Sequence, residues 1–231
     1  MFQVYQIAVG WVVFGTLFSI YLHYTTHGIW NTPSMLLSFF LWLNGLICLW
    51  EVCLFFKIQH IYQIYLKWKK QYGGREYQAV KELAFMKVSL KGIFDPHTWG
   101  HIWATYSVYD PSYANKESFG FFIDVGNGFT TLIPSFLFLF NMTFNILSGR
   151  ILGIVGLMSF YQEWYGTIIY WLSYIVNHRY RNFGFAQIFF FVACTNALWF
   201  IFPLYGIYVS IHLILHDDLS IFHTPQPIFF H

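Results

Sequence analysis

The stretch "CTNALWFIFPLYG", Cys194 to Gly206, lies within one of the most apolar parts of this 231-residue chain. It carries an amide, Asn196, which is followed at helical spacing by Trp199 and Pro203. An amide placed in the hydrocarbon core of a bilayer without a hydrogen-bond partner is costly. If this stretch crosses a membrane, Asn196 should therefore face the interior of a helix bundle, where a partner can satisfy it.

The composition of the whole chain supports a membrane location. Hydrophobic residues make up 57% of the sequence and charged residues only 10%, whereas soluble domains carry about 25% charge. A chain this apolar cannot hide its surface in one soluble core. The length suits one domain, so we predict a single membrane domain over residues 1–231. The three cysteines, Cys48, Cys53 and Cys194, all fall inside apolar runs and do not suggest a disulfide framework.

Five windows are long and apolar enough to cross a bilayer, which takes about 20 mostly apolar residues. Backbone in lipid must satisfy its own hydrogen bonds, so we predict that each window is a helix. The predicted fold is an all-α bundle of five transmembrane helices, with a long basic loop over residues 57–119 between the second and the third. The windows cover residues 4–23, 33–56, 120–145, 151–176 and 187–215.

The basic residues lie mostly on one side of such a bundle. Nine of the 12 fall in the 57–119 stretch, and Arg179 and Arg181 lie in the connection between the fourth and fifth spans, which faces the same side. Only Arg150 is opposite. The positive-inside rule therefore predicts that the loop and the N-terminus face the cytoplasm or the matrix, and the C-terminus the other side.

One segment of the basic stretch, "YQAVKELAFMKVSLKGIF" at 77–94, has apolar residues at helical spacing with lysines between them. We predict an amphipathic helix that lies on the membrane surface, its basic side toward anionic headgroups. An ordinary solvated helix is the alternative.

Polar side chains recur at helical spacing in four of the five predicted spans. We predict that they converge on one intramembrane pocket lined with aromatic residues. The alternative is that the amides only bond one helix to another. The residues in these stripes are Asn44, Cys48 and Glu51; Asp124, Asn127 and Thr131; Gln162, Glu163, Tyr165 and Tyr170; and Asn196 and Trp199. The predicted pocket residues among them are Asn44, Glu51, Asn127, Gln162, Tyr165, Tyr170, Asn196 and Trp199.

Other site classes lack a signature in the sequence. The histidines at His23, His27, His101 and His178 show no metal-ligand spacing, so no metal site is predicted. There is no phosphate-binding glycine motif and no nucleic-acid-binding pattern, and no cofactor is expected.

Three motifs in order resemble the EXPERA family, which includes the sterol Δ8–Δ7 isomerase (emopamil-binding protein) and the sigma-2 receptor. "WATYSVYDPSY", Trp103 to Tyr113, resembles the family's W-x-x-Y-x-x-x-D-x-x-Y stretch. "YGTIIYWLS", Tyr165 to Ser173, looks like the isomerase's fourth helix, and "NALWFIFP", Asn196 to Pro203, is similar to its fifth. The resemblance covers about residues 103–215.

The resemblance implies a five-helix bundle with a sterol-sized pocket. In the isomerase a carboxylic acid protonates a ring alkene, and a base then removes a proton elsewhere to move the double bond. Glu51 matches the second-helix catalytic Glu, Asn196 the pocket amide and Trp199 the indole that faces the cation. If this chain is an isomerase, its catalytic residues should be Glu51 and Asp124, the carboxyl nearest to the family's third-helix Glu.

The sequence also departs from the isomerase. The His that stands one turn before the second-helix Glu is replaced by Ile47 or Cys48, and the third-helix Glu aligns near Val125. We therefore expect a non-catalytic EXPERA-like protein that binds membrane lipid or sterol, or that serves as an accessory subunit beside other membrane-protein subunits. An apolar tail at 221–231, if ordered, suggests such a partner. Sterol isomerase is the alternative. Two membranes fit the sequence, the endoplasmic reticulum and the mitochondrial inner membrane.

Overall fold

The computed structural model describes residues 1–225, without the side chain of Asn182, and it is almost entirely helical. Part of the tail expected to contact a partner, residues 226–231, lies outside the described residues. In chain order the elements are β1 (Phe2–Gln3), α1 (Val4–His27), α2 (Thr32–Tyr72), α3 (Glu76–Phe85), β2 (Lys87–Val88), α4 (Leu90–Ile93), α5 (Pro96–Tyr109), η1 (Pro111–Ala114), α6 (Phe119–Phe144), α7 (Gly149–Val176), η2 (Arg179–Asn182), α8 (Phe185–Ile188), η3 (Phe189–Cys194), α9 (Thr195–His216) and α10 (Ser220–His223).

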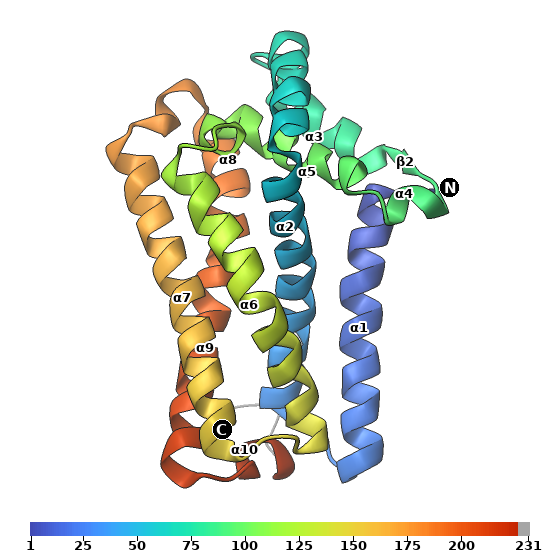
Figure 1. Cartoon of the computed structure of the whole chain (residues 1–231), viewed down its shortest axis with the longest axis vertical. Helices are drawn as coiled ribbons and strands as arrows, with labels where there is room; N and C mark the ends of the chain where they lie inside the picture. The colour runs from blue at the N-terminus through green and yellow to red at the C-terminus, as the bar shows by residue number, and fades with distance from the viewer. Residues whose placement is uncertain (226–231) are drawn as a thin grey trace.

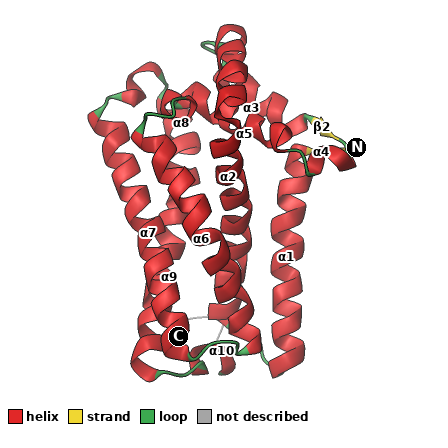
Figure 2. Ribbon diagram, viewed as in Figure 1, coloured by secondary structure: helices red, strands yellow, loops and turns green. Residues whose placement is uncertain are grey.

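The long helices α1, α2, α6, α7 and α9 lie side by side, with their axes along the long dimension of the molecule (Figure 1). Helix α2 packs against α1 and α6, and α7 packs against α6 and α9. The short helices α3, α4 and α5 gather at the end where α1 begins, and loops are confined to the two ends of the bundle (Figure 2).

Four helical segments of the described residues are long and apolar enough to span a membrane. They are Val4–His27, Thr32–Tyr72, Phe119–Phe144 and Phe185–His216, the last of which combines α8, η3 and α9. The chain is therefore an all-α, multi-pass membrane protein.

Side-chain caps explain where the long helices begin. Asn31 accepts a hydrogen bond from the Ser34 amide at the start of α2, where Pro33 occupies the first turn. Ser118 caps α6 and Ser148 caps α7 in the same way. Each of these oxygens satisfies a backbone N–H that has no partner within the helix.

The basic stretch predicted as a loop over residues 57–119 is mostly helical. Helix α2 continues to Tyr72 and kinks at Lys57, whose φ of −118° and ψ of 15° are not helical. This kink falls where the predicted second span ends. Beyond it, Ile61, Tyr65, Trp68 and Tyr72 recur on one face and are buried. These side chains form one core with residues of α5, which keeps the chain helical after it leaves the apolar window.

The amphipathic helix predicted over residues 77–94 is wrong as a single helix. Helix α3 ends at Phe85, and β2 then pairs antiparallel with β1, with Gln3 opposite Lys87. Ser89 accepts a hydrogen bond from the Gly92 amide and starts α4. A Ser cap and a backbone pairing with the N-terminal strand thus outcompete the helical periodicity.

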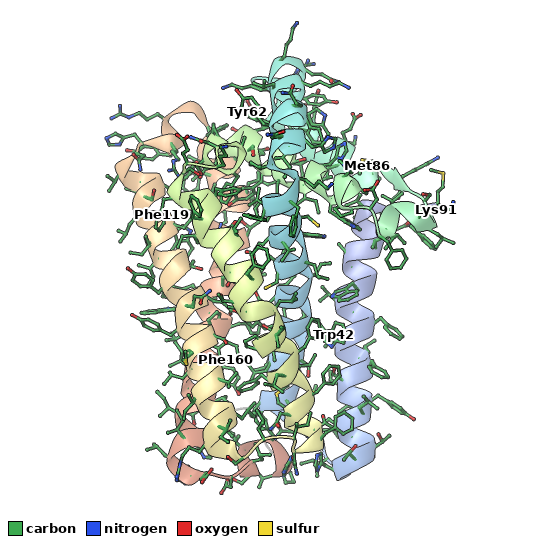
Figure 3. All side chains as sticks on the ribbon, in the orientation of Figure 1. Trp42, Tyr62, Met86, Lys91, Phe119 and Phe160 are labelled. Atoms are coloured by element: carbon green, nitrogen blue, oxygen red, sulfur yellow. The ribbon has the colours of Figure 1, made fainter. Side chains whose placement is uncertain are left out.

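Tryptophan side chains tie α1 to α2. The Trp42 indole nitrogen donates to Ser19 Oγ at 2.9 Å, and the Trp11 indole donates to the Trp42 carbonyl at 3.0 Å. Figure 3 shows Trp42 between the two helices, and Phe160 in the half of the bundle opposite the short helices. Both indole donors are satisfied inside the apolar bundle, which fixes α1 at its edge.

Helices α2 and α6 approach most closely at Gly128. A Cβ at this position would lie 2.7 Å from Glu51 Cβ and 3.0 Å from the Cys48 carbonyl oxygen. Only glycine leaves room for the α2 backbone there, so the contact depends on the missing side chain.

Gly128→Ala is expected to lower the free energy of unfolding by about 1–3 kcal/mol, because the added methyl overpacks the contact. Gly126→Ala is the matched control, since a Cβ at Gly126 meets nothing within 4 Å. Its effect should be neutral or stabilising by up to about 1 kcal/mol. Thermal unfolding of the detergent-solubilised variants measures both, and equal stabilities would contradict the close contact.

Candidate functional site

A cavity of about 480 Å³ lies between α2, α5, α6, α7 and α9, with η1 closing one end. Its lining is largely aromatic and aliphatic, interrupted by carboxyl, amide and hydroxyl groups. The structure thus brings the predicted polar stripes of four helices to one place. The predicted residues that line it are Glu51, Asp124, Asn127, Gln162, Tyr170, Asn196 and Trp199.

Glu51 is held by an amide from the neighbouring helix. Asn127 Nδ2 lies 3.2 Å from Glu51 Oε1 and 2.9 Å from Oε2. The Thr131 hydroxyl lies 3.2 Å from Asn127 Oδ1 and 3.0 Å from the Asn127 carbonyl, either of which can accept its proton. Glu51 is only 4% exposed, so this amide contact fixes its carboxyl group against the wall of the cavity.

Asn44 lies behind the cavity wall and connects three helices. Its Nδ2 donates to Glu163 Oε1 at 2.7 Å, and its Oδ1 accepts from the Trp199 indole at 2.8 Å. The other Glu163 oxygen, Oε2, is buried without a hydrogen-bond partner among the described residues. Asn44 therefore positions the indole and one carboxyl oxygen of the cavity wall rather than lining the cavity itself.

Asn196 is satisfied within α9 and across to α5. Its Nδ2 donates to the Val192 carbonyl at 2.8 Å and lies 3.2 Å from the Tyr106 hydroxyl. Tyr106 in turn lies 3.1 Å from the Tyr170 hydroxyl. The amide that interrupts this apolar stretch thus has partners in a polar chain along the cavity.

Pro203 explains a further contact between α7 and α9. Proline has no amide hydrogen, so the carbonyl of Trp199, four residues earlier, loses its helical donor. The Thr167 hydroxyl lies 3.4 Å from this carbonyl and 3.0 Å from the Glu163 carbonyl. The proline thereby frees an acceptor that a neighbouring helix can use.

The segment from Trp103 to Tyr113 forms one end of the cavity. The Trp103 indole donates to the Trp50 carbonyl at 2.7 Å, and its ring stacks on Tyr113 at 5.5 Å between centroids. Tyr106 meets Tyr113 edge-on at 4.9 Å. These aromatic rings of α5 and η1 cover the polar groups that the long helices contribute.

Asp110 positions this aromatic end from outside the cavity. It is fully buried, its Oδ1 accepts from the Ser112 amide at 3.1 Å, and its Oδ2 forms an ion pair with Arg179 at 2.9 Å. The ion pair ties the start of η1 to the connection after α7. Asp110 thus fixes the backbone that carries Tyr113 into the cavity.

Tyr165 lies where the sequence analysis did not expect it. It is 47% exposed and stacks on Tyr161 at 5.9 Å, on the outer face of α7. Tyr165 follows Glu163 by two positions, which is about 200° around a helix with 3.6 residues per turn. A residue beside Glu163 in sequence therefore points away from the cavity that Glu163 lines.

Several lining residues were absent from the predicted pocket. For the residues of α5 and η1, the signal was the motif that runs from Trp103 to Tyr113, which was used only for the family resemblance. Glu163 was placed in a polar stripe but not in the pocket, and Trp50 directly precedes Glu51. These lining residues are Trp50, Trp103, Tyr106, Tyr113 and Glu163.

The cavity offers acid groups and aromatic faces but no basic side chain. Three carboxyl groups line it, those of Glu51, Asp124 and Glu163, and none of the described lining residues is Lys, Arg or His. No group of three or more His, Cys, Asp or Glu side chains in residues 1–225 is arranged to hold a metal ion. Such a site can hold the polar group of an otherwise apolar ligand, and its carboxyl groups can in principle move protons.

Comparison of the chain with protein families, with curated proteins and with solved structures found no match. The functional argument therefore depends on the geometry of the cavity.

Arg179→Met is expected to destabilise the fold by about 3 kcal/mol, because it leaves the Asp110 carboxylate buried without its counter-charge. Arg181→Met, in the same turn, is the control. Arg181 is exposed and forms no ion pair with another described residue, so its loss should change stability by less than about 0.5 kcal/mol. Thermal unfolding in detergent compares the two, and a similar small effect for both would argue against the anchoring role of Asp110.

Proposed function

We propose that this chain is a non-catalytic, EXPERA-like integral membrane protein that binds a lipid or sterol in its intramembrane cavity, or serves as an accessory subunit of a larger membrane complex. The observation that carries the binding proposal is the convergence of seven predicted residues on one cavity of about 480 Å³. This volume falls within the range of about 300–1,000 Å³ that is typical of small-molecule sites.

The chemistry of the lining favours a lipid-like ligand. Rings from Trp50, Trp103, Tyr106, Tyr170 and Trp199 supply most of a flat, apolar surface. The polar groups are few and lie within the bundle, where the hydroxyl or headgroup of a mainly apolar molecule can bond to them. A ligand of this kind can enter from the bilayer, whereas a water-soluble metabolite cannot partition there.

We also propose five membrane crossings, with α7 as the fifth. Helix α7 is 28 residues long and lies between α6 and α9. Its outer face exposes large apolar side chains, among them Ile154, Met158, Leu172 and Ile175. These side chains suit contact with acyl chains along the length of the helix. Five crossings place the basic end of the bundle toward the cytoplasm or the matrix.

The absence of a histidine near Glu51 supports a non-catalytic role. The position one turn before Glu51 is Ile47 or Cys48; Ile47 lines the cavity, and Cys48 is buried with its Sγ 3.2 Å from Thr131 Oγ1. Neither side chain replaces an imidazole as a proton carrier at neutral pH. The cavity can thus retain its shape and its ligand without the isomerase's set of acid and base groups.

A second candidate function, sterol isomerase, is favoured by one specific observation. Asp124 and Glu163 line the same cavity as Glu51. A pair of carboxyl groups that face one ligand can in principle serve as proton donor and acceptor, and Trp199 presents an indole that could stabilise a cation between them.

Filling the cavity tests the binding proposal. A Cβ at Gly166, which lines the cavity, first meets Ile123 Cγ2 at 3.6 Å, so Gly166→Leu directs its side chain into open space. It should reduce co-purified lipid or sterol at least about tenfold, as expected for a loss of about 1.4 kcal/mol in binding. Lipid extraction and mass spectrometry measure this, and co-migrating proteins are identified in the same preparation.

Gly10→Leu on α1 is the matched control, because a Cβ there meets nothing within 4 Å and Gly10 does not line the cavity. It should keep its lipid. If Gly166→Leu retains as much lipid as the unmodified chain, the cavity is not the binding site.

The isomerase alternative is tested in a cell that lacks sterol Δ8–Δ7 isomerase. We expect no measurable conversion of the Δ8 sterol, because general acid–base groups typically contribute about 10²–10⁴-fold each and the histidine is missing. Sterol analysis by mass spectrometry is the readout. Robust conversion that Glu51→Gln and Glu163→Gln each abolish would replace the binding proposal with the enzymatic one.

Labelling of single introduced cysteines tests the orientation. Lys87→Cys should react with a membrane-impermeant maleimide only from the cytoplasmic or matrix side. Arg150→Cys, at the opposite end of the bundle, should react only from the other side. Sealed vesicles of known orientation separate the two outcomes, with the unmodified chain as background. Labelling of both positions from one side would exclude five crossings in this arrangement.

A further inference from the structure

A second cleft, of about 680 Å³, lies at the end of the bundle where α1 begins and is separate from the intramembrane cavity. Its walls come from α2 beyond the kink, from β2 and α4, and from the first turns of α5. Figure 3 shows Met86 and Lys91, two of its lining residues, on the projecting part of the structure beside α1. The lining also includes Lys87 and the histidines His60, His97 and His101.

The cleft carries an excess of positive charge. Lys57 adjoins it, with Nζ 3.1 Å from His97 Nε2, and adds a third ammonium to those of Lys87 and Lys91. The carboxylate in the lining is Asp95, whose Oδ1 accepts from the His97 amide at 2.9 Å. The ion pairs that the described residues form lie elsewhere in the fold. Three ammonium groups thus face one carboxylate, and the cleft is positive even with neutral histidines.

The wall of the cleft also holds an unused polar atom. His60 Nε2 is buried without a hydrogen-bond partner among the described residues. Its ring meets that of His97 edge-on at 4.7 Å between centroids. An anion in the cleft could give this nitrogen a partner after a small side-chain adjustment, which would remove the cost of leaving it unpaired.

The β pairing sets the depth of the cleft relative to the bilayer. Gln3 lies opposite Lys87, and the first membrane span begins at the next residue, Val4. The Lys87 backbone is therefore fixed at the level where the chain enters the hydrocarbon region. Cationic side chains at this level meet the phosphate groups of the lipids.

Apolar side chains surround the cleft on the same projection. Phe85, Leu90 and Phe94 are exposed by 53%, 69% and 86%. Water does not favour three large exposed apolar side chains on two short neighbouring helices, whereas the boundary between headgroups and acyl chains accommodates them. Cations beside such apolar groups are typical of a surface that lies in a membrane interface.

We propose that this cleft binds the phosphate headgroup of an anionic phospholipid, with Lys87 and Lys91 as its principal ligands and Lys57 as supporting charge. The acyl chains of the lipid run along the exposed apolar face of α1, which begins beside the cleft. This site is independent of the intramembrane cavity, because the two share no lining residue.

Native mass spectrometry of the purified full-length chain tests the proposal. The protein in detergent is titrated with phosphatidylglycerol, with phosphatidylcholine and with inorganic phosphate. The unmodified chain should bind one phosphatidylglycerol molecule more tightly than phosphatidylcholine. Lys87→Gln with Lys91→Gln should weaken phosphatidylglycerol binding about thirtyfold, and Lys91→Gln alone about fivefold, as expected for two lysines and one at a lipid surface.

The matched control removes the same charge outside the cleft. Lys67→Gln with Lys70→Gln changes two exposed lysines of α2 and should leave phosphatidylglycerol binding within about twofold of the unmodified chain. Lys87→Arg with Lys91→Arg keeps the charge and should retain binding. Thermal unfolding confirms that each variant is folded, and the single variant Lys91→Gln carries the test if the double variant is not.

Three results would overturn the proposal. Equal losses in the two glutamine pairs would reduce the effect to general charge. Equal binding of phosphatidylcholine and phosphatidylglycerol would remove the headgroup preference. Binding of inorganic phosphate as tight as that of phosphatidylglycerol would show a free-anion site without a lipid. Because the readout does not involve the cavity, none of these results depends on whether Gly166→Leu loses its ligand.

Discussion

The contact between α2 and α6 at Gly128 is the constraint from which the rest of the bundle follows. The missing side chain lets the two backbones approach, and the neighbouring Asn127 then reaches both oxygens of Glu51. A carboxyl group in an apolar bundle is costly unless it has hydrogen bonds. A slide of one helical turn, about 5.4 Å, would strand the carboxyl and the amide together. The pair therefore sets the register of α2 against α6.

The same physical rule fixes the helices on the other side of the cavity. Asn44 bonds to Glu163 on α7 and accepts from Trp199 on α9, so one amide sets the positions of two further helices. These bonds use the inward faces of the helices and leave the outward faces to apolar side chains. The cavity is the space that remains between helices whose register is set by polar contacts rather than by close apolar packing.

The residues that close the cavity come from a part of the chain that is not a long helix. Trp103, Tyr106 and Tyr113 reach the cavity from α5 and η1, and the ion pair between Asp110 and Arg179 holds this segment against the end of α7. The proposed headgroup cleft lies on the same end of the bundle, on the other side of α5. On the two proposals, the protein contacts lipid at two depths, with apolar rings inside the bilayer and lysines at its surface.

Composition and the length of apolar windows, as read from the sequence, determined that this is a helical membrane protein, because the backbone of a long apolar segment has few alternatives in lipid. Helical spacing also identified Glu51, Asn127 and Asn196 as inward-facing, since polar groups in lipid must find partners. The sequence further placed the end of the second predicted span next to the kink at Lys57.

Tertiary structure decided what helical spacing leaves open. It extended α2 through the basic stretch, because the buried face at Ile61 and Trp68 packs with residues of α5 far along the chain. It interrupted the predicted amphipathic helix by pairing Lys87 with Gln3. It turned Tyr165 outward and set Asn44 behind the cavity wall. Each of these outcomes depends on how one element is rotated and placed against another, and local periodicity carries no information about that placement.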